Sequence, residues 1–484
     1  MKYLFGSLTH LAGAALILLL AACGGSGSTP AKPAPVISSA SSSSQPSSSS
    51  SSQQSSSHSS SSSSTHSLPD RASNGAIYCT PAGSDPDGDG WGWENNATCL
   101  VRNSQADPDR GDFDGCIIDT GSWPYCAADN GSWGLEEETV CISRSFCPAH
   151  RSAEQSGINS APVTLGASAK TRAVYQYLLS IHGSKTLSGQ QDLTWFDGID
   201  MFQRVLDDTG KAPAIMGYDF MNYGLANLSG LQQTEEGIAH WDRGGLVSFA
   251  WHWRDPSRET LEFYADRASV RIPVSKGQLN TGSSLFAKMR DDIDMIAAEL
   301  KRLEDAGVVV LWRPLHEASG GWFWWGASRS DDIAPAYAQT LLWRYMFDRL
   351  THHHQLTNLI WVWNGQSAAW YPGDAYVDIV SMDIYDGRQN YQSQIEAYQQ
   401  VKSWPLQAKP VALSENSNIP DPDNIAADGA WWLWFMVWND SNTAPGVSHQ
   451  DNFWTGEYYN TNAHKVHVYN HPGVINLDDL PSFD

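Results

Sequence analysis

Two glutamates of this chain each follow a short apolar run and stand beside other reactive side chains. Glu317 lies in "VVVLWRPLHEASGGWFWWG", where a histidine precedes it and four aromatic residues follow a Gly-Gly pair. Glu415 lies in "PVALSEN", between a serine and an asparagine. Two carboxylates facing one cleft can cleave a glycosidic bond, because one protonates the leaving oxygen while the other attacks the anomeric carbon. The pair therefore predicts glycoside-cleaving chemistry.

The surroundings of the two glutamates differ in a way that separates these roles. The aromatic run 322–325 places apolar surface beside Glu317, and desolvation raises the pKa of a carboxyl group. Ser414 and Asn416 give Glu415 a more polar setting that favours its charged form. We therefore expect Glu317 to donate the proton and Glu415 to attack.

The elements that must position these residues are strands alternating with helices. Amphipathic stretches at 287–307 and 333–354 have the apolar spacing of helices. This alternation favours an α/β fold, a (β/α)8 TIM barrel, although an open doubly wound sheet would alternate similarly. The eight candidate strands are 186–190, 213–219, 245–253, 307–314, 359–364, 377–385, 410–416 and 434–440.

Polar and aromatic residues gather at the C-terminal ends of these candidate strands, which is where barrel enzymes build their sites. In a barrel the fourth and seventh strands face each other, so Glu317 and Glu415 should meet across the mouth. The residues at these ends are Asp219, His252, Glu317, Asn364, Asp383, Tyr385, Glu415, Trp438 and Asn439.

Five motifs between about residues 165 and 455 resemble glycoside hydrolase family 26, most of whose members are β-mannanases. The motifs are "WRPLHEASGGWFWWG", "FAWHW", "VDIVSMDIYD", "LSEN" and "WFMVWND". The resemblance implies that Glu317 is the general acid/base and Glu415 the nucleophile of a retaining mechanism. Ala318 and Ser319 stand where the family often has Asn, so the resemblance leaves the leaving-group side of the cleft open.

The same resemblance implies a set of substrate-binding residues around the two glutamates. His316 would hold the substrate beside the acid, and Tyr385 would position the nucleophile. Asp383 and Arg313 would orient these groups, while the other residues would line the cleft. The full set is His252, His316, Trp322, Trp325, Asp383, Tyr385, Trp438 and Arg313.

We therefore expect a retaining endo-β-1,4-mannanase, a monomer without cofactor or metal, acting on mannan, galactomannan or glucomannan. Two alternatives remain at this stage. One is another family 26 β-glycanase, a β-1,3-xylanase or a mixed-linkage β-glucanase. The other is a carbohydrate-binding lipoprotein without catalytic activity.

The N-terminal region predicts an export signal and a tether. Residues 1–22 resemble a bacterial lipoprotein signal, which implies cleavage before Cys23 and attachment of lipid to that cysteine. The apolar run is too short to form a membrane-spanning helix. We expect a lipid-anchored location in the bacterial cell envelope, at the outer membrane, or secretion. Residues 23–73 are rich in serine and predict a flexible linker, whereas the catalytic domain is expected at 160–484.

Residues 74–150 contain six of the seven cysteines, which in an exported chain indicates a disulfide-rich module. Six cysteines allow 15 pairings. A repeat, Tyr-Cys followed later by Trp-Gly-x-Glu-x4-Cys, occurs at 78–99 and again at 125–141. Its symmetry favours the pairs Cys79–Cys99, Cys126–Cys141 and Cys116–Cys147.

The two Trp-Gly-x-Glu segments resemble carbohydrate-binding module family 10. That resemblance implies cellulose binding through a row of aromatics, here Trp91, Trp93, Trp123 and Trp133. Leu135 replaces the second aromatic of the repeat.

Two segments could suggest a metal site. Residues 85–89, "DPDGD", open like a calcium loop, but Asn96 stands where such a loop has its bidentate glutamate, so a solvated turn is favoured. The histidines of "THHHQ" at 351–355 suit a helix C-terminus better than a metal site.

Composition excludes one class of function. The formal net charge is −23, with 30 Lys and Arg against 53 Asp and Glu, so nucleic-acid binding is not expected. The 22 tryptophans are typical of clefts that stack against sugar rings.

Overall fold

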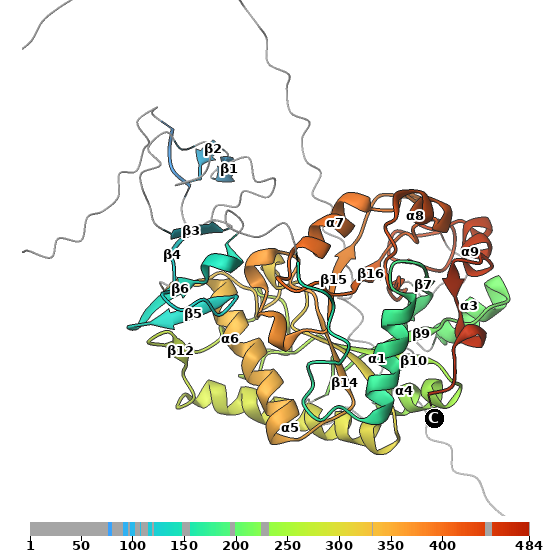
Figure 1. Cartoon of the computed structure of the whole chain (residues 1–484), viewed down its shortest axis with the longest axis horizontal. Helices are drawn as coiled ribbons and strands as arrows, with labels where there is room; N and C mark the ends of the chain where they lie inside the picture. The colour runs from blue at the N-terminus through green and yellow to red at the C-terminus, as the bar shows by residue number, and fades with distance from the viewer. Residues whose placement is uncertain are drawn as a thin grey trace, which may run out of the picture.

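The structure is a computed structural model with a large body of helices and strands and a smaller β region beside it (Figure 1). The predicted signal, Cys23, the serine-rich linker and the 85–89 turn lie outside the described residues. The structure describes residues 76–79, 91–94, 97–101, 107, 115–118, 121–147, 155–193, 199–223, 232–331, 333–440 and 448–483.

Within the described residues, seven strands of the large body form one parallel sheet. Seven of the eight predicted strands are thus confirmed in position. The order of the strands is β16-β15-β14-β13-β10-β9-β8, so each pairs with its neighbour along the chain. They are β8 (Gly189–Gln191), β9 (Ile215–Asp219), β10 (Leu246–Trp251), β13 (Val310–Pro314), β14 (Leu359–Trp363), β15 (Ile379–Ile384) and β16 (Val411–Asn416).

The eighth candidate, 434–440, joins both edges of this sheet without forming a named strand. Val437 makes a parallel bridge to Gln190 of β8 and another to Asn416 of β16. Backbone hydrogen bonds support both contacts: Val437 N–H donates to Gly189 O at 3.2 Å, and Trp438 N–H donates to Asn416 O at 3.1 Å. The hydrogen bonds of this segment therefore connect the first strand of the sheet to the last.

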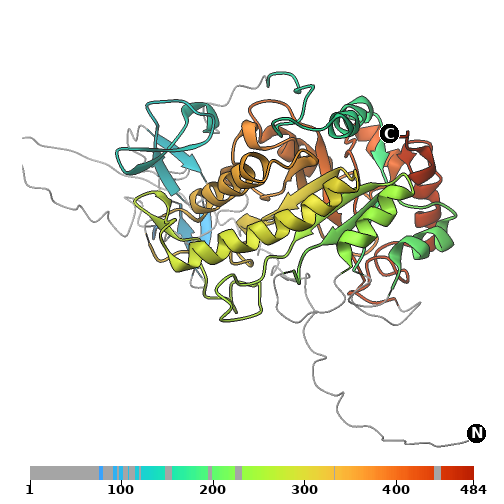
Figure 2. The ribbon, with the colours of Figure 1, turned by 90° about the horizontal axis from the view of Figure 1, so that it is seen from below.

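Helices follow the strands and pack against them. In α5, Ser283 caps the first turn, and the buried residues Phe286, Met289, Ile293 and Leu300 recur with helical spacing. Figure 2 shows α5 and α6 running along the same side of the body. The helices are α1 (Ala169–Ile181), α3 (Met201–Thr209), α4 (Gln233–Asp242), α5 (Ser284–Asp305), α6 (Pro335–Asp348), α7 (Ile395–Ser403), α8 (Pro422–Asp428) and α9 (Asn462–Tyr469).

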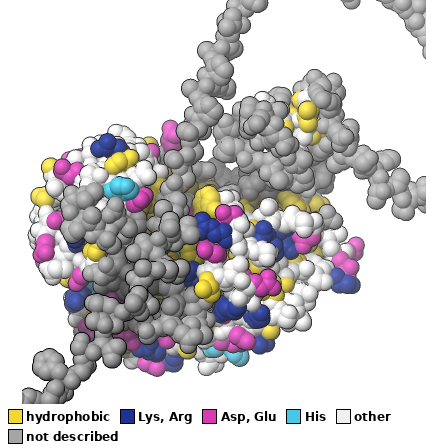
Figure 3. Space-filling view, turned by 180° about the vertical axis from the view of Figure 1, so that it is seen from behind, with side chains coloured by type: hydrophobic (Ala, Val, Ile, Leu, Met, Phe, Trp, Pro, Cys, Tyr) yellow, Lys and Arg dark blue, Asp and Glu magenta, His cyan; other side chains and the backbone are white. Residues whose placement is uncertain are grey.

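Both faces of the parallel sheet are buried. Alternate strand residues belong to two separate apolar clusters: Ile215, Leu311 and Ile379 lie in one, whereas Met216 and Val310 lie in the other. Strands buried on both faces are typical of sheets covered by crossover helices. Among the helices of the described ranges, none is long and apolar enough to span a bilayer. Basic and acidic side chains are interspersed on the described part of the face in Figure 3.

The smaller region consists of three antiparallel hairpins in the described ranges. All three predicted disulfide pairs are confirmed: Cys79–Cys99, Cys116–Cys147 and Cys126–Cys141. The internal repeat predicted them because two of the pairs close equivalent segments. The strands are β1 (Trp91–Glu94), β2 (Ala97–Leu100), β3 (Gly115–Ile118), β4 (Gly121–Pro124), β5 (Trp133–Glu136) and β6 (Thr139–Ile142).

Candidate active site

The sheet brings the two glutamates together at the C-terminal ends of its strands. Glu415 lies on β16, and Glu317 follows β13 by three residues. A carboxylate oxygen of each lies within 4.8 Å of the other, and Asp383 at the end of β15 shares this cluster. A retaining glycosidase holds its carboxyl groups roughly 5–5.5 Å apart, whereas an inverting enzyme needs roughly 6.5–9.5 Å. The spacing suits direct attack by one carboxylate rather than activation of an intervening water.

Glu317 is held in a tight turn by the segment that follows β14, residues 364–371, here termed the β14 loop. The backbone of Glu317 is left-handed, with φ of 52°, an uncommon conformation for a residue other than glycine. The Glu317 N–H donates to Asn364 O at 2.7 Å, and the Ser319 N–H donates to Gly365 O at 3.1 Å. The β14 loop therefore fixes the backbone that carries this carboxyl group.

Arg313 on β13 forms hydrogen bonds with two of the clustered carboxylates, those of Asp383 and Glu415. Its guanidinium donates to Asp383 Oδ2 at 3.1 Å and also to Glu415 Oε1. The Tyr385 hydroxyl donates to the other oxygen, Glu415 Oε2, at 2.6 Å. Both oxygens of Glu415 are thus hydrogen-bonded, which fixes the plane of the carboxylate. Asn364 donates to Asp383 Oδ1 at 2.7 Å and holds that side chain in turn.

The electrostatics favour one shared proton, held by Glu317. Burial raises the pKa of Glu317 well above its usual range, and the negative charges of Asp383 and Glu415 raise it further. Burial and Asp383 also raise the pKa of Glu415, to about 7, against the lowering effects of Arg313, His252 and Tyr385. Arg313 contacts Glu415 directly, so the ionised form is favoured there. The polar contacts that favour ionised Glu415 come from Arg313 and Tyr385 rather than from its sequence neighbours.

Three further side chains, Asp219, His252 and His316, are linked in sequence beside the glutamates. Asp219, at the end of β9, accepts hydrogen bonds from the His252 backbone at 3.0 Å and its Nδ1 at 2.5 Å. His252 Nε2 then lies 3.3 Å from His316 Nε2. Burial lowers the pKa of His316, so its ring is neutral near pH 7. Asp219 was predicted to lie at a strand end, but no role was predicted for it. Its two hydrogen bonds to His252 show that it orients the His252 ring.

The aromatic run after Glu317 divides into one accessible ring and three buried ones. Trp322 is 46% exposed, and its indole N–H donates to Glu317 Oε2 at 2.9 Å. Trp325 was predicted to line the cleft, which is wrong: its ring is 1% exposed, and its N–H donates to His316 O at 2.8 Å. Trp325 therefore supports His316 from behind. Trp438 lies beside His252, with ring centroids 5.8 Å apart.

Comparison with known proteins assigns the family. The sequence matches Glycosyl hydrolase family 26 over residues 163–479.

The chain belongs to glycosyl hydrolase family 26.

Relatives of this family 26 chain include curated proteins and proteins of solved structure. Mannan endo-1,4-beta-mannosidase of Thermothelomyces thermophilus is 44% identical over 286 residues, covering 57% of this chain and 56% of that protein. The structure of the Podospora anserina GH26-CBM35 β-(1,4)-mannanase aligns with a TM-score of 0.58 at 34% identity, covering 71% of this chain and 72% of that one.

A second solved relative is a β-mannanase from a symbiotic protist of the termite Reticulitermes speratus, complexed with gluco-manno-oligosaccharide. It aligns with a TM-score of 0.57 at 32% identity, covering 68% of this chain and 100% of that one. The chain spans about half the length of the curated relatives it matches, 56%, 52% and 49% for three of them.

The aromatic residues assigned to the small module are not equivalent in this family 26 chain. Trp133 was predicted to bind carbohydrate, which is wrong, because its side chain is 1% exposed and packs against the catalytic body. Trp123 is half-buried and meets Trp133 edge-on, with ring centroids 5.1 Å apart. The side chains of Trp91 and Trp93 lie outside the described residues.

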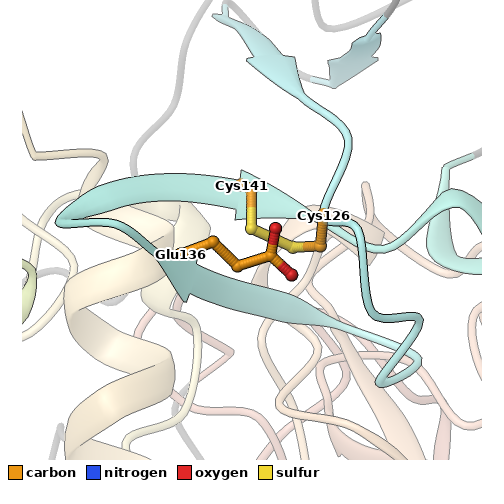
Figure 4. A group of neighbouring side chains, drawn as sticks. All are labelled: Cys126, Glu136 and Cys141. Carbon is orange, nitrogen blue, oxygen red and sulfur yellow. A yellow bond between two sulfur atoms is a disulfide. The ribbon is translucent and has the colours of Figure 1, made fainter.

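Three groups of side chains in the described ranges have the spacing of metal ligands. Cys126, Glu136 and Cys141 form one of them, but the two sulfurs are joined in a disulfide and cannot act as thiolate ligands (Figure 4). The Glu136 carboxylate instead accepts from the backbone N–H groups of Ala127 and Ala128 at 2.8 and 2.9 Å.

The other two groups are Glu317 with Asp383 and Glu415, and the surface set Asp421, Asp423 and His467. The first contains the glutamates already described: Glu415 accepts from Arg313 and Tyr385, and Glu317 accepts from Trp322. His354 of "THHHQ" lies 2.7 Å from Asp294 in an ion-pair geometry.

Replacing Tyr385 by phenylalanine should move the acidic limb of the pH–activity profile to higher pH. Burial and Asp383 raise the pKa of Glu415, and the Tyr385 hydroxyl, which donates to the ionised form, is one of the groups that hold it down to about 7. Without that bond the carboxyl group holds its proton more strongly, so activity should begin about one pH unit higher. Measuring kcat/KM against pH tests this.

Tyr459→Phe is the matched control for Tyr385→Phe. Its hydroxyl donates to Gln450 O at 2.9 Å, and its ring stacks on Phe453, which packs against Tyr385. This variant should leave the acidic limb where it is in the wild type. An unchanged limb in Tyr385→Phe would contradict the role given to its hydroxyl.

Proposed function

We propose that this protein is a retaining endo-β-1,4-mannanase that hydrolyses mannan, galactomannan or glucomannan. The observation that carries the proposal is the close pair Glu317 and Glu415, with one glutamate beside an accessible tryptophan and the other held by Arg313. The names of the family 26 relatives, mannan endo-1,4-beta-mannosidase and β-mannanase, support mannan as the substrate class.

In the first step, Glu415 attacks the anomeric carbon with one carboxylate oxygen, and the glycosidic C–O bond breaks. The proton on Glu317 passes to the departing oxygen, which leaves as the hydroxyl of the released chain. The product is a glycosyl ester on Glu415 with inverted configuration. Arg313 and Tyr385 aim the attacking carboxylate, while the buried setting keeps Glu317 protonated beforehand.

In the second step, ionised Glu317 takes a proton from water, and the water oxygen attacks the same carbon. The ester bond to Glu415 breaks, Glu415 leaves as a carboxylate, and a second inversion restores the β configuration. Glu317 ends protonated, so the starting state is regenerated. The neighbouring charge matters here: once Glu415 is esterified, its negative charge no longer raises the pKa of Glu317, which can then ionise as a base.

A panel of polysaccharides tests the substrate. We expect reducing-sugar release from galactomannan and glucomannan, and none from xylan, β-1,3-xylan or mixed-linkage β-glucan. A rapid fall in viscosity relative to sugar release would support internal cleavage. Release from β-1,3-xylan or mixed-linkage glucan without mannan cleavage would replace the proposal with the corresponding glycanase. Absence of any cleavage would favour a binding protein.

The remaining proposals concern the domain organisation and the attachment of the protein to the membrane. A (β/α)8 catalytic barrel at 160–484 would be tethered by the serine-rich linker to lipid at Cys23, in the bacterial cell envelope. The module at 74–150, which resembles carbohydrate-binding module family 10, would bind polysaccharide through Trp91 and Trp93. Cys23→Ser should shift the protein from the membrane fraction to the soluble one, and Trp91→Ala should reduce retention on cellulose or insoluble mannan.

A further inference from the structure

Residues 121–147 of the small module, which include its second repeat, pack onto the catalytic body through the fully buried side chains of Ser132 and Trp133. Figure 1 shows β5 and β6 beside α6 and β12 (Gln278–Leu279). The Trp133 indole N–H donates to Ala369 O at 2.7 Å, and the Ser132 hydroxyl donates to Tyr371 O at 3.0 Å. Both carbonyl oxygens belong to the β14 loop, defined above as residues 364–371. The module therefore supplies two hydrogen-bond donors to this loop.

Other contacts fix the orientation of the docked hairpin. The Arg344 guanidinium of α6 donates to Trp133 O at 3.3 Å, and it also donates to Pro372 O at 2.9 Å. The Trp133 ring lies 5.9 Å from that of Tyr337, also on α6. Gly277 lies in the turn between β11 (Val274–Ser275) and β12, and Leu135 packs so closely on it that a Cβ at Gly277 would lie 2.3 Å from the Leu135 side chain. The hairpin β5–β6 is thus held by three elements of the catalytic body: the β14 loop, α6 and the turn at Gly277.

The other end of the β14 loop makes the backbone contacts of the acid/base residue. Asn364 O accepts from Glu317 N–H at 2.7 Å, and Gly365 O accepts from Ser319 N–H at 3.1 Å. Gln366 donates to Asp383 O at 3.0 Å. Only two residues separate Gln366 from Ala369 along the chain. A displacement of Ala369 and Tyr371 would therefore be transmitted over a short, hydrogen-bonded segment to the turn that carries Glu317.

We propose that Trp133 and Ser132 of the small module are positioning residues for the general acid/base Glu317, acting through the β14 loop. This inference rests on the proposed function of Glu317. Leu135 occupies the position where the first repeat has an aromatic residue, and this smaller side chain fits against Gly277. The second repeat thus serves as a brace for the active-site loop.

Loss of the contacts between Trp133, Ser132 and the β14 loop should lower the rate only for substrates whose leaving group must be protonated by Glu317. A polysaccharide leaving group needs the proton of Glu317, whereas a 2,4-dinitrophenolate leaves without one. For the aryl substrate, kcat/KM reports glycosylation of Glu415 and is independent of proton donation. Small misplacements of a catalytic group can lower rates by up to about 100-fold. We expect Trp133→Phe, which keeps a ring but removes the N–H, to lower kcat/KM on galactomannan about 10-fold.

The experiment compares full-length wild type, Trp133→Phe, Ser132→Ala and the control Ser145→Ala on two substrates. The substrates are soluble galactomannan and 2,4-dinitrophenyl β-mannobioside. The proposal predicts that Trp133→Phe and Ser132→Ala lose activity on galactomannan while keeping wild-type kcat/KM on the aryl substrate. Ser145→Ala removes a hydroxyl from the same module, one that donates to Asp129, and it should match the wild type on both substrates.

Three results would overturn the proposal. An equal loss on both substrates would mean that Trp133 acts through general stability, which thermal melting of each variant would report. Full activity on soluble galactomannan with weaker retention on insoluble mannan would make Trp133 a carbohydrate-binding residue. Wild-type values throughout would show that the loop is not braced. Failure of the wild type to cleave galactomannan would instead contradict the proposed function, before any variant is compared.

Discussion

Replacing Glu415 by alanine should abolish hydrolysis of mannan, and azide should restore turnover with an α-configured product. Removal of a nucleophile lowers kcat by at least about 10⁴-fold, because no other group forms the covalent intermediate. The lost carboxylate leaves space beneath the anomeric carbon, between Arg313 and Tyr385. Azide can enter that space and attack the same face, while Glu317 still protonates the leaving oxygen.

The configuration of the azide product makes this test specific. A single displacement by azide inverts a β-mannoside to an α-mannosyl azide. If Glu415 were the acid/base, azide would instead attack a glycosyl-enzyme and give the β product. Glu259→Ala, at an exposed position in the loop after β10, should hydrolyse mannan like the wild type and serves as the control. Retained hydrolysis in Glu415→Ala would remove the nucleophile assignment.

Replacing Glu317 by alanine should separate substrates by their leaving groups. Mannan hydrolysis should fall by about 10³-fold or more, since the departing sugar oxygen then receives no proton. With 2,4-dinitrophenyl β-mannobioside, kcat/KM should stay near the wild-type value. The second step still needs a base, so kcat should fall, KM should fall with it, and the glycosyl-enzyme should accumulate.

The pH profile gives a second readout of the same substitution. The wild-type profile should be bell-shaped: activity rises as Glu415 ionises, with a pKa near 7, and falls as Glu317 loses its proton at higher pH. In its residual hydrolysis of mannan, whose leaving group needs a proton, Glu317→Ala should keep the acidic limb and lose the alkaline one. Persistence of the alkaline limb in that variant would show that another group is the acid.

Much of the active site followed from local sequence, because its residues stand at the ends of strands. Short apolar runs ending in polar residues predicted seven strands and placed Glu317, Asp383 and Glu415 at one edge. The eighth run, 434–440, was predicted as a strand but joins both sheet edges only by single bridges. Local composition cannot distinguish these outcomes, since pairing depends on how both neighbouring edges approach.

The sequence by itself determined the reactive pair, the strand ends that carry it and the disulfide pairing, because residue types, periodicity and an internal repeat encode them locally. Only the tertiary structure decided which tryptophans face solvent and what holds the site. Trp325 and Trp133 have the same sequence character as accessible Trp322, yet both are buried. Trp133 meets its partner Ala369 across 236 residues of chain. Burial of a ring depends on which distant surface packs against it, and that is settled only when the whole chain folds.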